Sequence, residues 1–404
     1  MIVLRAVIFL MMKSIINKTA TFFIYLLATT LAVSCIKEPE FENVIEGIRV
    51  NHAPDPREGV FEVSGEWQRR KEIMLTGETD RAQLKKMVSD SLRLAGFIVR
   101  DSITLLPVNV PWPWALVNLS TASIRSSPSH RAEMVNQAVM GTPVKVLKEN
   151  GGWVYIQTPD NYLGWCEKSS LSGMSDKDLI EWKNSPRVIF LNIYGFVRCR
   201  ETDQNISDLV AGAILEKTGE EGNITMVNLP DGRKGFIDKA DISCFDTWKN
   251  RVEPEADALT ETAMTMKGIP YLWGGTSVKG FDCSGFTRTL FFMNGFIIPR
   301  DASLQVRHGR NIPVTANPEV LEPGDLLFFR GDPEGADDSP VTHVALYTGN
   351  SEYIHAAGMV RINSLDSSRH DYNAYRHATL QSARRIIKAD PAGGVLPVSD
   401  HPWY

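Results

Sequence analysis

The stretch "KGFDCSGFTRTLFF" at residues 279–292 places a cysteine between an aspartate and a serine, at the start of an apolar run. Phe286, Leu290 and Met293 recur at helical spacing, which predicts a helix with one buried face. Cys283 then lies at or just before the first turn, where unpaired backbone N–H groups favour a thiolate. A free cysteine beside a helix is also commonly a small buried hydrophobic residue, so the motif alone leaves both interpretations open.

A nucleophilic cysteine needs a base that accepts its proton and a third group that orients this base. His343 and His355 bracket "HVALYTGNSEYIH", where two alternating runs joined through residues 349–351 predict a β-hairpin. Because side chains alternate along a strand, the two histidines share a face only if the loop has an odd number of residues. A three-residue loop pairs Ala345 with His355 and makes His343 its diagonal neighbour, about 7–8 Å away at the backbone.

Tyr271, in "GIPYLWGG", precedes the cysteine by twelve residues. Its hydroxyl and the backbone N–H of Cys283 could together stabilise the oxyanion of a tetrahedral intermediate. A packed strand tyrosine is the structural alternative. The adjacent Gly274 and Gly275 would allow backbone segments to approach closely.

The composition excludes several classes of function. The chain has 404 residues, 43% of them hydrophobic and 23% charged, which suits several globular domains. A formal net charge of -5 indicates no basic surface for phosphates, so we do not expect nucleic acid as a partner. The five cysteines lack CxxC or Cys/His metal spacing, so we expect no disulfide framework, metal or other cofactor.

The N-terminus has the pattern of an export signal. The uncharged run "ATFFIYLLATTLAV" at residues 20–33 follows Lys13 and Lys18 and is short for a membrane span. The "LAVSC" that ends it resembles the bacterial lipoprotein cleavage box, which implies a signal peptide at residues 1–35 and lipid attachment at Cys35. We therefore expect an exported, membrane-anchored protein of the cell envelope. A secreted protein and an uncleaved anchor are the alternatives.

The region after the signal contains a tether and then an internal repeat. In residues 36–112, an acidic segment leads into a small helical region with apolar residues every fourth position. Two later stretches, "GTPVKVLKENGGWVYIQTPDNYLGWCEKSSL" and "GAILEKTGEEGNITMVNLPDGRKGFIDKADI", align at a constant offset of 71 residues. Their alternation and Pro-Asp turns predict short strands of two small barrels, at 113–175 and 185–245. The "GW" of the first copy resembles bacterial SH3-like domains attached to cell-wall enzymes, whereas Phe236 replaces the tryptophan in the second. Two unrelated β modules are the alternative.

The remaining motifs lie in residues 257–390. "PYLWGG", "FDCSGF", "PRDASLQ", "PGDLLFF" and "THVALYTGNSEYIHAAG", in this order, resemble the NlpC-type cell-wall cysteine peptidases, which have a papain-like fold. The resemblance implies that Cys283 is the nucleophile, His343 the general base and His355 the group that orients it, with Tyr271 in the oxyanion site. The expected architecture is a multidomain α+β protein with two small SH3-like β-barrels before a papain-like catalytic domain.

This domain order resembles the subgroup that cleaves between D-glutamate and the diamino acid of peptidoglycan peptides with a free N-terminal L-alanine. The first SH3-like domain of that subgroup supplies an acid, which meets the α-amino group, and a tyrosine. By motif these are Glu133 in "SHRAEMVNQA" and Tyr162 in "PDNYLGW". Either residue could instead lie on the solvated surface.

The resemblance also implies that Asp282 and Ser284 position the Ala-D-Glu portion of the substrate, although Asp282 could cap the helix as well. Ser303 of "PRDAS" stands one residue later than the serine of the family's "PRxS" pattern, which leaves open whether it contacts the substrate carboxylate. The expected partners are peptidoglycan peptides and, through the lipid anchor, a membrane. We expect a monomer.

Three other functions compete with this interpretation. A non-catalytic wall-binding protein would have no need of an activated thiol. A related thiol amidase or acyltransferase acting on lipid would call for an apolar groove rather than Glu133. A zinc site made of Cys283, His343 and His355 would be revealed by sensitivity to chelators.

Overall fold

The computed structural model describes residues 41–251, 255–314, 320–336, 339–387 and 395–404. The predicted signal peptide and the predicted lipid attachment at Cys35 lie outside the described residues. The described chain divides into two compact units. The smaller unit contains the described residues before Asp55 with Glu62–Gly77 and Gln83–Ile103, and the larger contains Asp55–Phe61, Glu78–Ala82 and Thr104–Tyr404.

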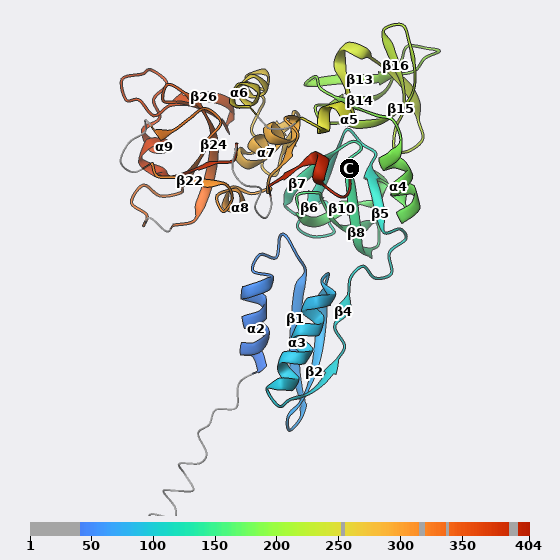
Figure 1. Cartoon of the computed structure of the whole chain (residues 1–404), viewed down its shortest axis with the longest axis vertical. Helices are drawn as coiled ribbons and strands as arrows, with labels where there is room; N and C mark the ends of the chain where they lie inside the picture. The colour runs from blue at the N-terminus through green and yellow to red at the C-terminus, as the bar shows by residue number, and fades with distance from the viewer. Residues whose placement is uncertain (1–40, 252–254, 315–319, 337–338, 388–394) are drawn as a thin grey trace, which may run out of the picture. The chain divides into compact units, whose positions relative to one another are not determined.

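The smaller unit combines helices with a β-sheet (Figure 1). Helix α3 (Ala82–Leu94) confirms the predicted helical element, because its apolar residues at every fourth position are buried. The prediction of a small helical region is nevertheless incomplete, because this unit also contains strands. A strand such as "FEVSGEWQR" alternates with a period of two, which the helical spacing does not reveal. The other elements are α2 (Phe41–His52), β1 (Phe61–Arg69), β2 (Glu72–Thr79) and β3 (Ile98–Asp101), and the strands are neighbours in the order β1-β2-β3.

Two seven-stranded sheets in the larger unit have the same topology. The first sheet contains β5 (Trp114–Val117), β6 (Thr121–Arg125), β7 (Met134–Val139), β8 (Pro143–Asn150), β9 (Trp153–Gln157), β10 (Leu163–Glu167) and β11 (Leu171–Met174). The second contains β12 (Arg187–Phe190), β13 (Tyr194–Arg198), β14 (Asn205–Val210), β15 (Ile214–Glu221), β16 (Ile224–Asn228), β17 (Lys234–Asp238) and β18 (Ile242–Cys244). The strand orders are β11-β5-β8-β9-β10-β6-β7 and β18-β12-β15-β16-β17-β13-β14. Each sheet is therefore ordered 7-1-4-5-6-2-3 along its own sequence.

Local irregularities recur at matching points of the two sheets. A short 3₁₀ helix, η1 (Lys168–Ser170) or η2 (Lys239–Asp241), precedes the last strand of each. The fourth strand of each carries a bulge, between Val146 and Lys148 in β8 and at the equivalent place in β15. Neither strand order returns to its beginning in the described residues, so the sheets are open and the predicted closure into barrels is not confirmed.

Short helices and the end of the chain pack together beside these sheets. Trp182 and Trp248 share a buried apolar cluster with Tyr404. His401 adds a hydrogen bond of 3.0 Å between its Nε2 and the carbonyl oxygen of Pro159. The C-terminal segment therefore helps to fix the first sheet within the larger unit. The elements concerned are α4 (Asp176–Asn184), α5 (Phe245–Lys249), β28 (Leu396–Pro397) and η4 (Val398–Asp400), and β4 (Thr104–Leu105) precedes the first sheet.

The C-terminal domain, described from residue 255 to 387, consists of a six-stranded sheet and helices. All neighbouring strands in the order β22-β27-β23-β24-β25-β26 are antiparallel. The strands of the sheet are β22 (Arg310–Ile312), β23 (Leu326–Arg330), β24 (Val341–Gly349), β25 (Glu352–Ala357), β26 (Met359–Ser364) and β27 (Leu380–Arg385). The other elements are α6 (Ala256–Thr265), β19 (Thr276–Ser277), β20 (Gly280–Phe281), α7 (Cys283–Met293), β21 (Phe296–Ile297), α8 (Ala302–Gln305) and α9 (Ala374–Thr379).

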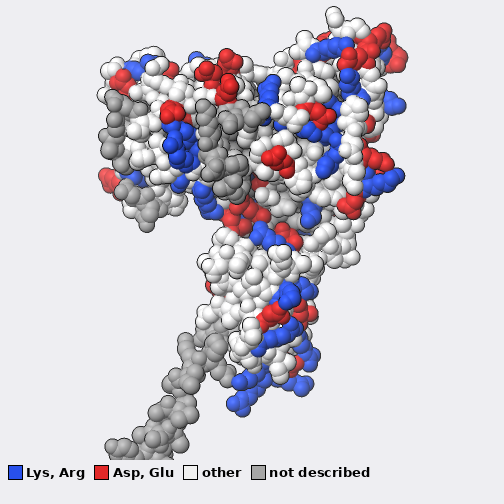
Figure 2. Space-filling view, in the orientation of Figure 1, with Lys and Arg blue, Asp and Glu red and all other residues white. Residues whose placement is uncertain are grey.

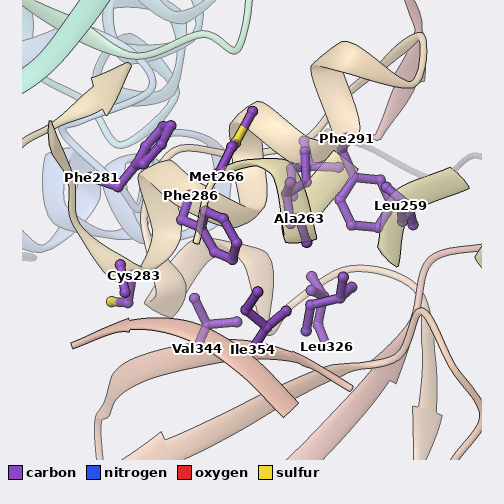
Figure 3. Close-up of a cluster of buried hydrophobic side chains, with 14 of the residues drawn as sticks. Leu259, Ala263, Met266, Phe281, Cys283, Phe286, Phe291, Leu326, Val344 and Ile354 are labelled. Carbon is purple, nitrogen blue, oxygen red and sulfur yellow. The ribbon is translucent and has the colours of Figure 1, made fainter. Parts of the chain in front are cut away.

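Helix α7 packs against β24 and β25 and supplies much of the core of this domain. Phe286 and Leu290 are fully buried against residues that include Val344 and Ile354 of the sheet. Figure 3 shows Cys283 at one end of this cluster, with its sulfur pointing away from the other labelled side chains. The helix thus holds the thiol at the edge of the apolar core.

Buried polar contacts join the first sheet to the C-terminal domain. The side-chain oxygen of Gln137 in β7 accepts hydrogen bonds from the backbone N–H of Thr276 and the hydroxyl of Ser277, each at 3.1 Å. Gly274 has a φ of +74°, and a Cβ there would lie 2.2 Å from the carbonyl oxygen of Met134. The close approach expected at this glycine is confirmed and brings the start of β7 beside the cysteine-bearing segment.

The visible surface mixes both signs of charge. Figure 2 shows lysine and arginine interspersed with aspartate and glutamate, without a continuous basic face on this side of the molecule. In the part of the chain that the structure describes, no helix is long and apolar enough to cross a membrane.

Candidate active site

Helix α7 begins at Cys283, three residues before the apolar repeat from which the helix is predicted. Asp282 is its N-cap, because the Oδ1 atom accepts a hydrogen bond of 2.7 Å from the backbone N–H of Gly285. The Oδ2 atom accepts a second bond, of 3.0 Å, from the N–H of Gly274. The expected capping role of Asp282 is confirmed, and its carboxylate fixes the backbone on both sides of the thiol.

A fully buried arginine holds the same carboxylate. Arg300 donates to Oδ1 and Oδ2 of Asp282 at 3.0 and 2.5 Å, which makes a bidentate ion pair. It also donates to the hydroxyl of Ser284 and to the side-chain oxygen of Asn136, each at 3.0 Å. Asn136 belongs to β7 of the first sheet, so one guanidinium links that sheet to the start of α7. The predicted substrate-positioning residues Asp282 and Ser284 both line the cavity described below and are oriented by Arg300.

The turn of the β24–β25 hairpin differs from the three-residue loop predicted from sequence. Gly349 pairs with Glu352, so the turn contains only Asn350 and Ser351, both with positive φ. A β-bulge between Tyr347 and Gly349 places one extra residue in β24. The extra residue that keeps the histidines on one face therefore lies in the strand, as a bulge, and not in the turn. A two-residue turn is favoured because its backbone twist matches that of the flanking strands.

The bulge places the two histidines on one face. Leu346 pairs with Ile354, and continuing this register by one residue sets Ala345 opposite His355, as predicted. The rings of His343 and His355 lie 4.9 Å apart and nearly perpendicular. His343 Nε2 is 2.7 Å from His355 Nδ1, so the imidazoles are hydrogen-bonded.

A third residue fixes which nitrogens carry protons. The side-chain amide of Asn363 in β26 donates to the carbonyl oxygen of Asp371 at 2.9 Å, which leaves its oxygen facing His355 Nε2 at 3.0 Å. His355 therefore carries its proton on Nε2 and accepts at Nδ1 from His343. A neutral His343 protonated at Nε2 has an unprotonated Nδ1, which is the nitrogen available to act as a base.

Both histidines are neutral at ordinary pH. Burial lowers the pKa of His343 well below 6.5, and the positive charge of Arg376 acts in the same direction. Burial also lowers the pKa of His355 to about 4, while its hydrogen bond to Asn363 opposes this shift. Each imidazole is therefore present in its neutral form, which is the form that can accept a proton.

The thiol does not have the depressed pKa expected at a helix start. Burial and the negative charge of Asp282 raise the pKa of Cys283 to about 11. The backbone amides of Val344 and Ser284 and the charge of Arg300 act in the opposite direction without reversing the shift. The effect of burial and of Asp282 therefore outweighs the expected stabilisation of a thiolate. Because the sulfur is protonated, its proton must leave as the sulfur attacks. The influence of Val344 also places the thiol against the strand residue that directly follows His343.

A cavity of about 540 Å³ opens over the thiol. Seven of the predicted catalytic and substrate-binding residues line it. The two predicted histidines do not line it and are buried, with exposed fractions of 5% and 1%. The seven are Cys283, Tyr271, Asp282, Ser284, Ser303, Glu133 and Tyr162. The side chains that the sequence predicts to act together therefore converge from both the first sheet and the C-terminal domain.

Three lining residues have defined partners. Tyr162 is buried rather than solvated, and its hydroxyl donates to Asp301 Oδ2 at 3.1 Å. Glu133 is exposed at the cavity and accepts a hydrogen bond of 2.7 Å from the indole N–H of Trp273. Burial and the charges of Cys283 and Asp282 raise the pKa of Tyr271 to about 12, so its hydroxyl stays a hydrogen-bond donor at neutral pH.

Sequence reasoning missed Asn363, Asp301 and Arg57. Asn363 lies two residues beyond Arg361, the partner of His355 in β26, so only the strand register puts it on the histidine face. Asp301 follows the buried arginine within the quoted motif "PRDAS", which could have suggested it. Arg57 gives no local signal, because it is 244 residues from its partner Asp301.

Within the described residues, no group of three or more His, Cys, Asp or Glu side chains is placed to hold a metal ion. The facing nitrogens of His343 and His355 are instead bonded to each other. Cys166, Cys199, Cys244 and Cys283 are free thiols.

Comparison with known proteins agrees with this geometry. Residues 268–381 match the NlpC/P60 family and residues 120–172 match the bacterial SH3 domain. A relative from Bacillus cereus, named gamma-D-glutamyl-L-lysine dipeptidyl-peptidase, is 30% identical over 63% of this chain and 78% of its own length. The chain belongs to the NlpC/P60 family. It is a cysteine-type peptidase with an SH3-like domain.

Two further relatives support this NlpC/P60 assignment. Dipeptidyl-peptidase 6 of Lysinibacillus sphaericus is 29% identical over 62% of this chain and 92% of its own length. The crystal structure of an NlpC/P60 family protein from Bacillus cereus superposes with a TM-score of 0.59 and 25% identity, and covers 67% of this chain and 99% of the other. The similarity to this NlpC/P60 protein therefore extends beyond the peptidase domain.

The first prediction concerns pH. If neutral His343 is the active form, kcat/KM should hold from pH 7 to below pH 6.5 and fall only as the pH passes through the lowered pKa of this imidazole. Steady-state rates from pH 4 to 8 would measure this limb, with circular dichroism at each pH to exclude unfolding. An acid limb with its midpoint at or above 6.5 would contradict the assignment.

The second prediction concerns the tautomer. Asn363→Leu removes the acceptor of the His355 Nε2 proton, so His343 loses its preference for an unprotonated Nδ1. We expect kcat to fall about 10- to 100-fold with KM changed less than about threefold. Nitrogen-15 NMR of the imidazoles should show mixed tautomers. The matched control is Asn205→Leu, at an exposed strand asparagine; an unchanged kcat or unchanged imidazole spectra for the Asn363 variant would count against the relay.

Proposed function

We propose that the protein hydrolyses the γ-D-glutamyl-diamino acid bond of peptidoglycan-derived peptides that carry a free N-terminal L-alanine. The observation that carries this proposal is the shared cavity, in which the thiol of Cys283 lies with Glu133 and Tyr162 from the SH3-like part. Two relatives with names specific for γ-D-glutamyl-L-lysine cleavage support the choice of bond.

In the proposed reaction, the sulfur of Cys283 attacks the γ-carbonyl carbon of the D-glutamyl residue. Its proton passes to Nδ1 of His343, and the imidazolium then gives this proton to the departing amine of the diamino acid as the C–N bond breaks. Water next attacks the thioester with the same imidazole as base, which releases the γ-carboxylate and restores the thiol. His355 and Asn363 hold the base in the required tautomer.

The oxyanion of each tetrahedral intermediate needs donors that are already in place. We assign this role to the hydroxyl of Tyr271 and the backbone N–H of Cys283. The raised pKa of Tyr271 supports the assignment, because the phenol keeps its proton at neutral pH. The N–H of Cys283 lies at the first turn of α7, where backbone donors have no partner within the helix.

We assign recognition of the free α-amino group to Glu133, with Tyr162 in the same cavity. An exposed carboxylate beside the aromatic ring of Trp273 suits an ammonium group. Asp282 and Ser284 are proposed to contact the Ala-D-Glu portion from the side of the nucleophile. Their contacts with Arg300 orient them for this role.

The second sheet is proposed to be a further SH3-like domain, at residues 185–245. Its strand order, its 3₁₀ helix and its bulge repeat those of the first sheet, which supports common descent. The sequence pattern around Cys35 supports the further proposal of an exported lipoprotein held at a membrane. We also propose that the protein acts as a monomer, because the described residues of one chain supply every group used in the reaction.

The third prediction tests the reaction itself. The mature protein should release L-Ala-D-Glu from L-Ala-γ-D-Glu-diamino acid tripeptide and leave intact peptidoglycan uncleaved, as followed by mass spectrometry. Cys283→Ala should abolish turnover while circular dichroism and the melting temperature stay close to those of the wild type. Turnover by this variant would remove the nucleophile assignment, and cleavage of intact wall would remove the requirement for a free amine.

The fourth prediction isolates the amine contact. Glu133→Gln keeps the size of the side chain but removes its charge, so KM for the free tripeptide should rise about 10-fold while kcat changes little. The N-acetylated tripeptide, which has no ammonium group, should become a relatively better substrate. Glu181→Gln, at an exposed position on α4, is the matched control. An unchanged preference for the free amine would reject the role of Glu133.

A further inference from the structure

A second cavity, of about 430 Å³, opens at the second sheet and shares no lining residue with the catalytic cavity. It lies where the end of α4 meets β12, β15 and η2. Arg187, the first residue of β12, lines this cavity and is 2% exposed. The proposed reaction does not use this arginine, so its position in a cavity wall needs a separate explanation.

Two aromatic rings contact the guanidinium of Arg187. Its Cζ lies 4.4 Å from the ring centre of Trp182 in α4 and 4.4 Å from that of Phe245 in α5. These cation–π contacts offset part of the cost of burying the positive charge. They do not supply acceptors for the N–H groups, which point outward in the plane of the guanidinium.

Most of the N–H groups of Arg187 have no acceptor. Nη2 donates to the carbonyl oxygen of Lys183 at 2.9 Å. Nε and Nη1, which carry three of the five N–H groups, are buried and have no hydrogen-bond partner among the described residues. Unpaired donors on a buried cation are costly, because the group has lost its solvation without gaining acceptors in its place. This arrangement suits an acceptor that comes from outside the chain.

Arg187 keeps its charge although it is buried. Burial lowers its pKa to about 10, and the negative charge of Asp246 opposes this shift. The guanidinium is therefore protonated at neutral pH. Asp246 is itself paired with Lys249 at 2.8 Å, and no carboxylate of the described residues forms an ion pair with Arg187.

Two lysines add to the positive charge of this cavity. Lys217 of β15 and Lys239 of η2 both line it, and both pair with the single carboxylate of Glu220. One carboxylate therefore serves two ammonium groups, while the charge of Arg187 has no paired acid. The lysine side chains are 34% and 37% exposed, so they can move aside for a ligand that enters from the solvent.

We infer that this cavity binds a small oxyanion, the carboxylate or phosphate group of a solute, with Arg187 as its main partner. Either group has oxygen atoms that can accept two hydrogen bonds from one guanidinium. Lys217 and Lys239 attract the anion and contact it from the solvent side. The inference makes the second sheet a ligand-binding domain, and it does not depend on the proposed reaction.

Anion titrations of the mature protein test this inference. Sodium phosphate and sodium acetate would be added at constant ionic strength, with sodium chloride as the control, while nitrogen-15 NMR follows the side-chain Nε–H signals of labelled arginine. The signal that is lost in Arg187→Lys belongs to Arg187. It should shift and saturate with phosphate, with acetate or with both, which identifies the group that binds. No saturable shift with either anion would overturn the inference, because the N–H groups would then be solvated by water only.

Two substitutions at the solvent side should change the affinity in opposite directions, and neither removes a buried group. Glu220→Gln removes the carboxylate that competes for the lysines, so the dissociation constant of the anion should fall at least about threefold. Lys239→Gln removes a positive charge, so the constant should rise at least about threefold. Lys177→Gln, at an exposed lysine of α4 outside the lining, is the matched control and should leave it unchanged.

The melting temperature, measured against anion concentration, gives these dissociation constants without an NMR assignment. It therefore keeps the inference testable if Arg187→Lys does not fold. Equal constants for the wild type, Glu220→Gln and Lys239→Gln would overturn the inference. A stabilisation by chloride as large as that by phosphate or acetate would overturn it as well, because it would mean that the anions act only through ionic strength.

Discussion

The ion pair between Arg300 and Asp282 is the constraint on which the rest of the site depends. Both groups are buried, so removing either partner would leave an uncompensated charge, at a cost of about 3–5 kcal/mol. The carboxylate caps the helix that begins with Cys283, and the guanidinium binds Asn136 of the first sheet. One interaction therefore sets the position of the Cys283 thiol and the docking of the SH3-like part that completes the cavity.

The proton relay depends on strand register rather than on helix position. His343, His355 and Asn363 come from three neighbouring antiparallel strands and are joined by hydrogen bonds of 2.7 and 3.0 Å. The carbonyl oxygen of Asp371 accepts a hydrogen bond from the side-chain amide of Asn363 and so fixes its orientation. This orientation determines the direction of both hydrogen bonds between the three side chains. A neutral backbone group thus selects which nitrogen of His343 stays unprotonated, and the third member of this hydrogen-bonded series is an amide rather than a carboxylate.

Much of this site could be predicted from the sequence, because its signals are local. The apolar repeat after Cys283 predicts the helix. The spacing between His343 and His355 predicts that they share a face of the hairpin if the connection between the strands has an odd number of residues. The sequence could not predict whether the extra residue lies in the turn or in a strand. A three-residue turn and a two-residue turn with a bulge both place the histidines on the same face. The raised pKa of Cys283 also escaped prediction, because burial is a property of the folded protein and outweighs the effect of the helix start.

Contacts between distant segments could not be predicted in the same way. The register of β26 brings Asn363 to the histidines, and tertiary packing brings Arg57 to Asp301 across 244 residues. The motif "GW" indicates the first SH3-like part, whereas the relation of the second sheet to it is clearest in the repeated strand order. Helical periodicity could not predict the strands of the smaller unit, because β1 alternates with a period of two.

The large sequence separation between Arg57 and Asp301 has a consequence for how the enzyme folds. Contacts of such high sequence separation form late in folding, because a large loop must close before they are gained. During synthesis Cys283 emerges before His343 and His355, whereas Glu133 and Tyr162 of the cavity wall come from a segment made earlier still. A nascent or partly folded chain therefore carries the thiol of Cys283 without the proposed base, and hydrolytic competence would appear only late in assembly.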